Sequence, residues 1–141
     1  MAGDISYLKR MRTGQSPHNI VTLGNGSDSF EVAVVLLSND IMLSINEDVE
    51  SRYHGTQDGE NIIKNPLDTP KNRAMYYNRL LCFHCMRVPE DLNQKVANDA
   101  DEIGQLLDDE DIKRVCEQYN NLLVNKAPKL SLLILFPEQN H

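Results

Sequence analysis

The sequence has no long apolar run, few cysteines and no dense group of basic residues, and each absence excludes a class of protein. No stretch approaches the roughly 20 consecutive apolar residues that cross a bilayer. Residues 1–11 also lack the apolar segment of a signal peptide. We therefore expect a soluble protein with no membrane partner. The three cysteines are an odd number in segments with helical periodicity, which indicates a reducing compartment, the cytoplasm, rather than a secreted disulfide framework.

Basic residues are outnumbered and scattered. The chain has 14 Lys and Arg against 21 Asp and Glu, so its formal net charge at pH 7 is -7. Only the start of the chain, with Lys9, Arg10 and Arg12, is locally basic, and three basic residues without interleaved aromatics are typical of a solvated arm. A chain of this charge repels phosphate backbones. We expect no nucleic-acid partner.

What is present is the composition of one globular domain. The chain has 141 residues, of which 40% are hydrophobic and 25% charged, enough for a single core. Repeats and low-complexity segments are lacking. The patterns predict a flexible N-terminal arm at 1–18, a single helical domain with an N-terminal β-hairpin at 19–128, and an apolar C-terminal tail at 129–141.

The first half of the domain predicts a hairpin followed by a helix. The segments 19–23 and 30–37 are rich in β-branched and large apolar residues, and the glycines between them suit a turn. Ser38, Asn39 or Asp40 caps a helix that runs to Tyr53, and Gly55 is expected to end it in the left-handed conformation. The polar segment 54–70 is predicted to be a long loop.

The second half predicts further helices. Thr69 and Pro70 open a helix that is apolar on nearly all sides and is expected to continue to Val88, before Pro89. The acidic stretch 90–111 predicts one or two short helices. Asp108 or Asp109 caps a last helix with the most regular amphipathic pattern in the chain. The predicted fold class is mainly α, of α+β type: an N-terminal β-hairpin packed on a bundle of about four to five helices.

Two motifs have metal-ligand spacing. Cys82 and Cys85 form a CxxC pair, but a structural zinc site needs four ligands and the only other cysteine is Cys116, so buried structural cysteines are favoured.

Asp99, Asp101 and Glu110 match acidic positions of a calcium loop, but Ile103 and Leu107 place hydrocarbon where oxygen ligands belong. A solvated acidic helix surface is favoured over a calcium-binding regulator. We therefore expect neither a metal nor another cofactor.

No catalytic set is visible. His18, His54, His84 and His141 are scattered, and the sequence places no nucleophile or carboxylate beside any of them in a recognisable triad. We expect a protein that binds other proteins and is not an enzyme.

The order of elements resembles the tail assembly chaperones of long-tailed bacteriophages, over roughly residues 19–125. The resemblance lies in the strand and helix of 30–53, the Tyr-x-x-Leu-Leu segment 77–81, the turn 87–90, and the acidic stretch leading to 115–119. It implies a protein of the host cell cytoplasm that coats the tape measure protein, presents it to tail-tube protein, and forms homo-oligomers. The alternative is a structural virion component of the connector or tail-terminator type.

The expected contact surfaces are apolar helix faces, which would hold an amphipathic helix of the client in a groove. The candidate partner-binding residues are Tyr76, Leu80, Phe83, Val115, Tyr119 and Leu122. The apolar tail is not matched by the resemblance, and it must be covered by the core or by a partner. It could be a β element, an oligomer contact or the junction region of a longer product. Its candidate oligomer or partner contacts are Leu132, Leu133, Ile134 and Phe136.

Overall fold

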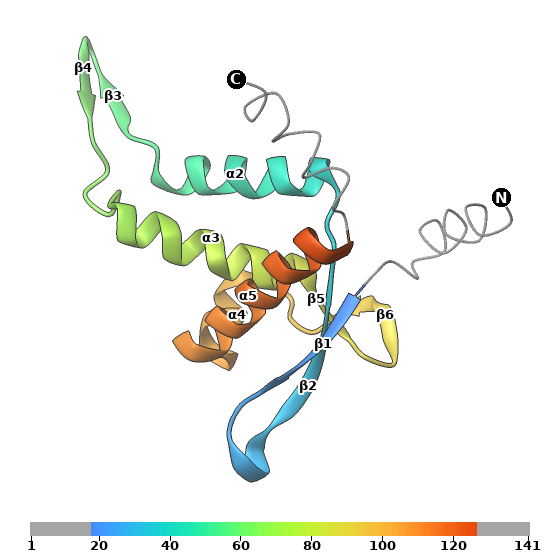
Figure 1. Ribbon diagram of the computed structural model, residues 1–141. Helices are drawn as coiled ribbons and strands as arrows, with labels where there is room; N and C mark the ends of the chain where they lie inside the picture. The colour runs from blue at the N-terminus through green and yellow to red at the C-terminus, as the bar shows by residue number, and fades with distance from the viewer. Residues whose placement is uncertain (1–17, 127–141) are drawn as a thin grey trace, which may run out of the picture.

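The fold is taken from a computed structural model, in which residues 18–126 are described. The predicted arm therefore lies outside the described residues except for His18, which begins the first strand. The predicted tail lies outside as well, with its candidate contacts Leu132, Leu133, Ile134 and Phe136. Within residues 18–126 the predicted fold class is confirmed: an N-terminal antiparallel hairpin packs against four α-helices (Figure 1).

The N-terminal hairpin forms as predicted. Strand β1 (His18–Leu23) pairs antiparallel with β2 (Phe30–Val35), in a register that places Val21 opposite Val32. A short 3-10 turn, η1 (Gly26–Asp28), connects them. Gly24 has a φ of 79°, and a Cβ there would lie 2.8 Å from the carbonyl oxygen of Asp28, so the turn requires glycine at this position.

Two further strands extend the hairpin into a sheet that the sequence did not predict. Helix α3 (Pro70–Cys85) ends before Val88, and β5 (Met86–Val88) and β6 (Asp91–Lys95) occupy positions expected to be helical. The sheet order is β1-β2-β5-β6, with Met86 opposite Val34. The prediction of a continuous helix was wrong because pairing with β2 outweighs local helix propensity.

Helix α2 (Asn39–Tyr53) begins as predicted, since the Ser38 hydroxyl accepts a hydrogen bond from the Ile41 N–H at 3.3 Å. The region after it is not the predicted long loop. Strands β3 (Thr56–Asp58) and β4 (Asn61–Ile63) form a second hairpin that projects from the body of the molecule (Figure 1). Gly55 is not left-handed; a Cβ there would lie 2.6 Å from the carbonyl oxygen of Ile63, so close approach of the hairpin explains the glycine.

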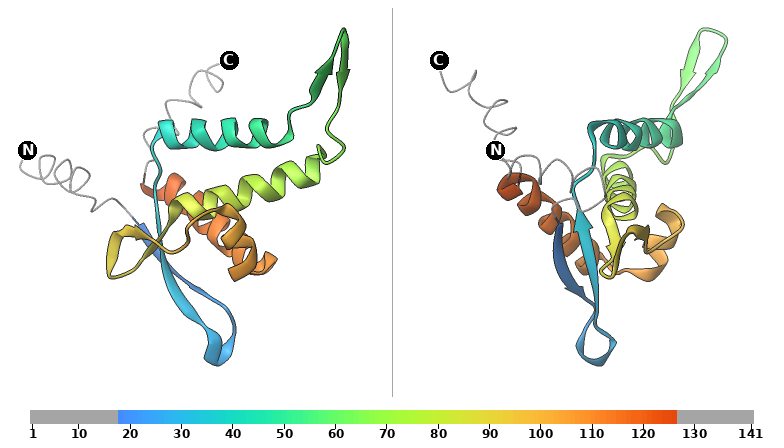
Figure 2. Two further views of the ribbon diagram at one scale, coloured as in Figure 1. Left: turned by 180° about the vertical axis from the view of Figure 1, so that it is seen from behind. Right: turned by 90° about the vertical axis from the view of Figure 1, so that its right-hand side faces the viewer.

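The remaining helices complete the core. Asp99 caps α4 (Ala100–Leu106), and Asp108 caps α5 (Asp109–Lys126) by accepting from the Asp111 N–H at 2.8 Å. The right-hand view of Figure 2 shows β1 and β2 between the end of α5 and the pair α3 and α4. The fully buried side chains come from every layer: Leu23, Val32, Val34, Ile45, Cys82, Cys85, Met86, Ile103, Val115 and Leu122. Within residues 18–126, no helix combines the length and apolar character that crossing a membrane requires.

Candidate functional site

One predicted contact surface, the apolar face of α5, lies in the protein's own core. Val115 and Leu122 are fully buried and Tyr119 is nearly so. The Tyr119 hydroxyl accepts a hydrogen bond from the Leu37 N–H at 3.4 Å, which ties α5 to the end of β2. An amphipathic pattern shows that one face of a helix is covered, but it does not show whether the protein's own core or a partner covers it. These three residues are therefore not available to a partner in this fold.

The other predicted surface, on α3, is partly accessible. Tyr76, Leu80 and Phe83 line a shallow depression of about 330 Å³ between α2, α3 and the start of α4, which we call the α3 depression. Leu80 is buried, whereas the two aromatic rings are half-buried. These three residues, which were predicted from the sequence to share a surface, therefore do line one depression.

Cations of the same chain already cover both aromatic rings of the α3 depression. The guanidinium carbon of Arg52 lies 4.3 Å from the ring centre of Tyr76, and Nζ of Lys95 lies 4.2 Å from that of Phe83. Tyr53 packs edge-on against Tyr76 with ring centres 6.1 Å apart. Such cation-π contacts stabilise the surface. A client helix would have to displace these cations to stack on the same faces of the rings.

His84, beside Phe83, lies in a locally positive environment. Burial and the charge of Lys95, whose Nζ is 3.4 Å from the imidazole Nδ1, lower the pKa of His84. Burial and the charge of Arg87 in turn lower the pKa of Lys95. This part of α3 therefore carries a neutral imidazole at pH 7.

A second opening, lined mainly by apolar residues, lies between β2, the β5–β6 turn and α4. This opening, the α4 groove, has a volume of about 450 Å³. Met86 and Ile103 form its buried floor, and Phe30 and Leu106 stand at its rim, 44% and 58% exposed. Its lining residues are Phe30, Glu31, Val32, Met86, Val88, Pro89, Glu90, Val96, Ile103, Leu106 and Leu107.

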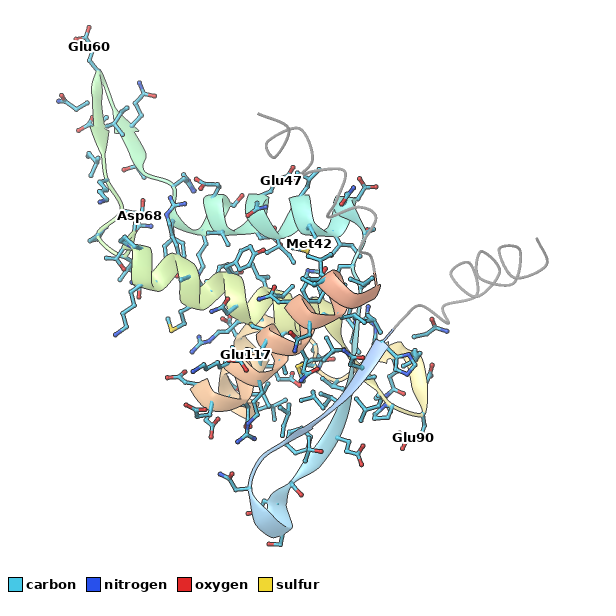
Figure 3. The ribbon with its side chains drawn as sticks, in the orientation of Figure 1. Met42, Glu47, Glu60, Asp68, Glu90 and Glu117 are labelled. Carbon is cyan, nitrogen blue, oxygen red and sulfur yellow. The ribbon has the colours of Figure 1, made fainter. Side chains whose placement is uncertain are left out.

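Local structure explains how the α4 groove is built. Asp99 accepts a hydrogen bond from the Glu102 N–H at 2.8 Å and so starts α4 where Ile103 points into the core. Leu106, one turn on, remains at the surface. Glu31 and Glu90 add negative charge at the rim, and Figure 3 shows Glu90 at the outer end of the β5–β6 turn. The sequence did not predict this site because Met86 and Val88, which line it from β5, were assigned to a continuous helix.

The second hairpin is anchored at its base by a charged network. Arg73 on α3 binds the carboxylates of both Asp68 and Glu50, with Nη2 3.1 Å from Oδ2 of Asp68. The hydrogen bond from Arg73 lowers the pKa of Asp68. Ile62 and Ile63 in strand β4 are exposed.

The cysteines pack α3 against α5. Cys82 and Cys85 are buried and Cys116 is partly buried. A hydrogen bond to Cys116, together with burial, raises the pKa of Cys82, and the same hydrogen bond lowers the pKa of Cys116. Burial raises the pKa of Cys85. The buried thiols are therefore poor nucleophiles.

The calcium-loop spacing does not form a loop. Asp99 is a helix cap, Asp101 lies on α4 with its carboxylate 3.7 Å from Arg52, and Glu110 lies in the first turn of α5. Across residues 18–126, His, Cys, Asp and Glu side chains form no group of three or more arranged to hold a metal ion.

No protein-family model, curated protein or solved structure matches this chain.

Proposed function

We propose that the protein is a non-catalytic tail assembly chaperone that binds an amphipathic helix of the tape measure protein in the α4 groove. The observation that carries this proposal is the groove itself, an apolar opening with a buried floor and exposed Phe30 and Leu106 at its rim. Grooves of this kind hold the apolar face of a helix, which inserts large side chains at intervals of three or four residues.

The rim chemistry specifies the client further. Glu31 and Glu90 lie beside an apolar surface, so they favour a helix whose flanks carry Lys or Arg. Closure over Phe30 and Leu106 removes exposed apolar surface from water, which contributes about 25 cal/mol per Å² buried.

The overall charge suits a solubilising role. A net charge of -7 keeps a protein with an exposed apolar groove dispersed, and it would do the same for a client bound to it. The phage setting, the tape measure client and the recruitment of tail-tube protein come from the sequence resemblance. The proposal predicts that the protein binds while tails assemble and leaves before the particle is complete.

A co-purification experiment with a matched pair of variants tests the proposal. Leu106 and Leu43 are exposed to the same extent, 58% and 60%, and both lie on helices, but only Leu106 lines the groove. We expect the parent protein and the Leu43→Glu variant to keep co-expressed tape measure protein soluble and to co-purify with it. The Leu106→Glu variant should neither keep the tape measure protein soluble nor co-purify with it.

Three results would contradict this. If the parent protein neither binds nor solubilises the tape measure protein, the function is wrong. If Leu106→Glu binds as well as Leu43→Glu, the groove is the wrong site. If mass spectrometry finds the protein at stoichiometric levels in mature virions, it is a structural component and not a chaperone.

A further inference from the structure

Strand β1 presents an edge that natural sheets usually protect. Among the strands in residues 18–126, β1 lies at one end of the sheet and β6 at the other. The β6 edge carries Asp91 and Lys95, the kind of charged residue that blocks further pairing. Between Asn19 and Leu23 there is no charged residue and no proline, and Ile20 is exposed. This edge is chemically suited to accept another strand.

Helix α5 delivers the C-terminal part of the chain to this edge. The Gly24 N–H, just after β1, donates to Oδ1 of Asp111 at 3.0 Å, near the start of α5. The Leu37 N–H donates to the hydroxyl of Tyr119 at 3.4 Å, near the other end of β1, because Val35 pairs with His18. Helix α5 therefore runs antiparallel to β1.

The end of α5 lies on the correct side of the sheet. Lys126 is seven residues past Tyr119, about 10 Å further along the helix axis. In the right-hand view of Figure 2, β2 lies on one side of β1 and the end of α5 lies on the other. The chain therefore leaves α5 near the start of β1, beside the edge that no other strand of residues 18–126 pairs with.

The residues that follow have the length and composition of a matching strand. Residues 127–129 suit an α-to-β connection, for which two to six residues are usual. Residues 130–136 read Leu-Ser-Leu-Leu-Ile-Leu-Phe, before Pro137. Seven residues of strand span about 23 Å, close to the roughly 20 Å of β1.

We propose that residues 130–136 of the same molecule add to β1 as a fifth strand, parallel to it. The alternation of a strand then places one set of tail side chains on the sheet face toward α5 and the other set on the opposite face, beside the exposed Ile20. Backbone pairing satisfies the edge of β1, and the apolar run is removed from water. This inference does not depend on the α4 groove, because the groove includes no residue of β1.

Residue-resolved amide exchange by NMR tests the proposal on the full chain. In the variant Leu133→Pro/Ile134→Pro, two adjacent prolines remove one backbone N–H from each side of the strand, so the side that would face β1 loses a donor in either register. We expect alternate β1 amides between Asn19 and Leu23 to exchange at least about tenfold faster than in the parent, while the amides of β2 paired with β5 are unchanged. The control Gln139→Pro/Asn140→Pro, beyond the strand, should match the parent.

Equal exchange of all β1 amides in the parent and the Leu133→Pro/Ile134→Pro variant would overturn the proposal. A second measurement does not depend on the variant: the parent chain should show backbone NOEs of a parallel pair between β1 and residues 130–136, and their absence overturns the proposal as well. Protection that falls on dilution would show that the strand comes from a second copy, which contradicts the intramolecular assignment.

Discussion

Two adjacent leucines of α5 test whether its apolar face is core or contact surface. Leu122 is fully buried and Leu123 is 39% exposed, so the same substitution to alanine samples both environments on one helix. Leu122→Ala removes about three methylene equivalents, worth about 0.8 kcal/mol each, and the cavity left behind adds to this. We expect Leu122→Ala to lower the free energy of unfolding by about 3 kcal/mol, and Leu123→Ala to lower it by less than about 1 kcal/mol.

Urea unfolding followed by circular dichroism measures this difference. With a slope of about 1.5 kcal/mol per molar urea, the Leu122→Ala midpoint should fall by about 2 M while that of Leu123→Ala moves little. Client binding, measured under conditions where both variants are folded, should be unchanged. If Leu122→Ala leaves stability intact within about 0.5 kcal/mol but abolishes binding, the α5 face is a contact surface and our placement of it in the core is wrong.

Three further predictions follow from individual groups. Asp111→Ala removes the acceptor of a backbone N–H at the β1–β2 turn and should cost about 1–3 kcal/mol in urea unfolding, and a loss below about 0.5 kcal/mol would contradict the role of that bond. Iodoacetamide should modify Cys116 in the native protein well before Cys85, since the pKa of Cys116 is lowered and that of Cys85 raised, and mass spectrometry showing the reverse order would refute this. Because the pKa of His84 is lower in the folded than in the unfolded protein, the unfolded chain is protonated at a higher pH, and the free energy of unfolding should fall as pH drops through about 6.5. Lys95→Met should raise the pKa of His84 in an NMR titration, and an unchanged pKa would exclude the charge of Lys95 as a cause.

The parts of the fold that the sequence predicted are those with local signals. The β1–β2 hairpin is set by its glycine turn, α2 by Ser38, and the start of α3 by Thr69, which accepts from the Asn72 N–H at 3.1 Å. The β3–β4 hairpin was missed although its pairing is local, whereas the error at the end of α3 lies where long-range pairing decides. Nothing local distinguishes Met86–Val88 from a continuing helix, and only the edge of β2 makes this segment a strand.

The candidate site shows the same division. Tyr76, Leu80 and Phe83 were expected together and do line one depression, because their helical spacing is a local property. The α4 groove joins β2, β5 and α4, whose contact depends on the sheet that the sequence did not predict. Likewise, the apolar face of α5 is evident from periodicity, but its burial in the core depends on tertiary packing.

The most direct test of the proposed function is to locate bound client on the protein. A helical peptide of the tape measure protein would be titrated into methyl-labelled protein and followed by NMR. If the client binds in the α4 groove, as we propose, the methyl signals of Val88, Val96 and Leu106, which line the groove, shift first and saturate together. Shifts confined to Leu80 in the α3 depression or to Leu122 in α5, or no shift at all, would contradict it.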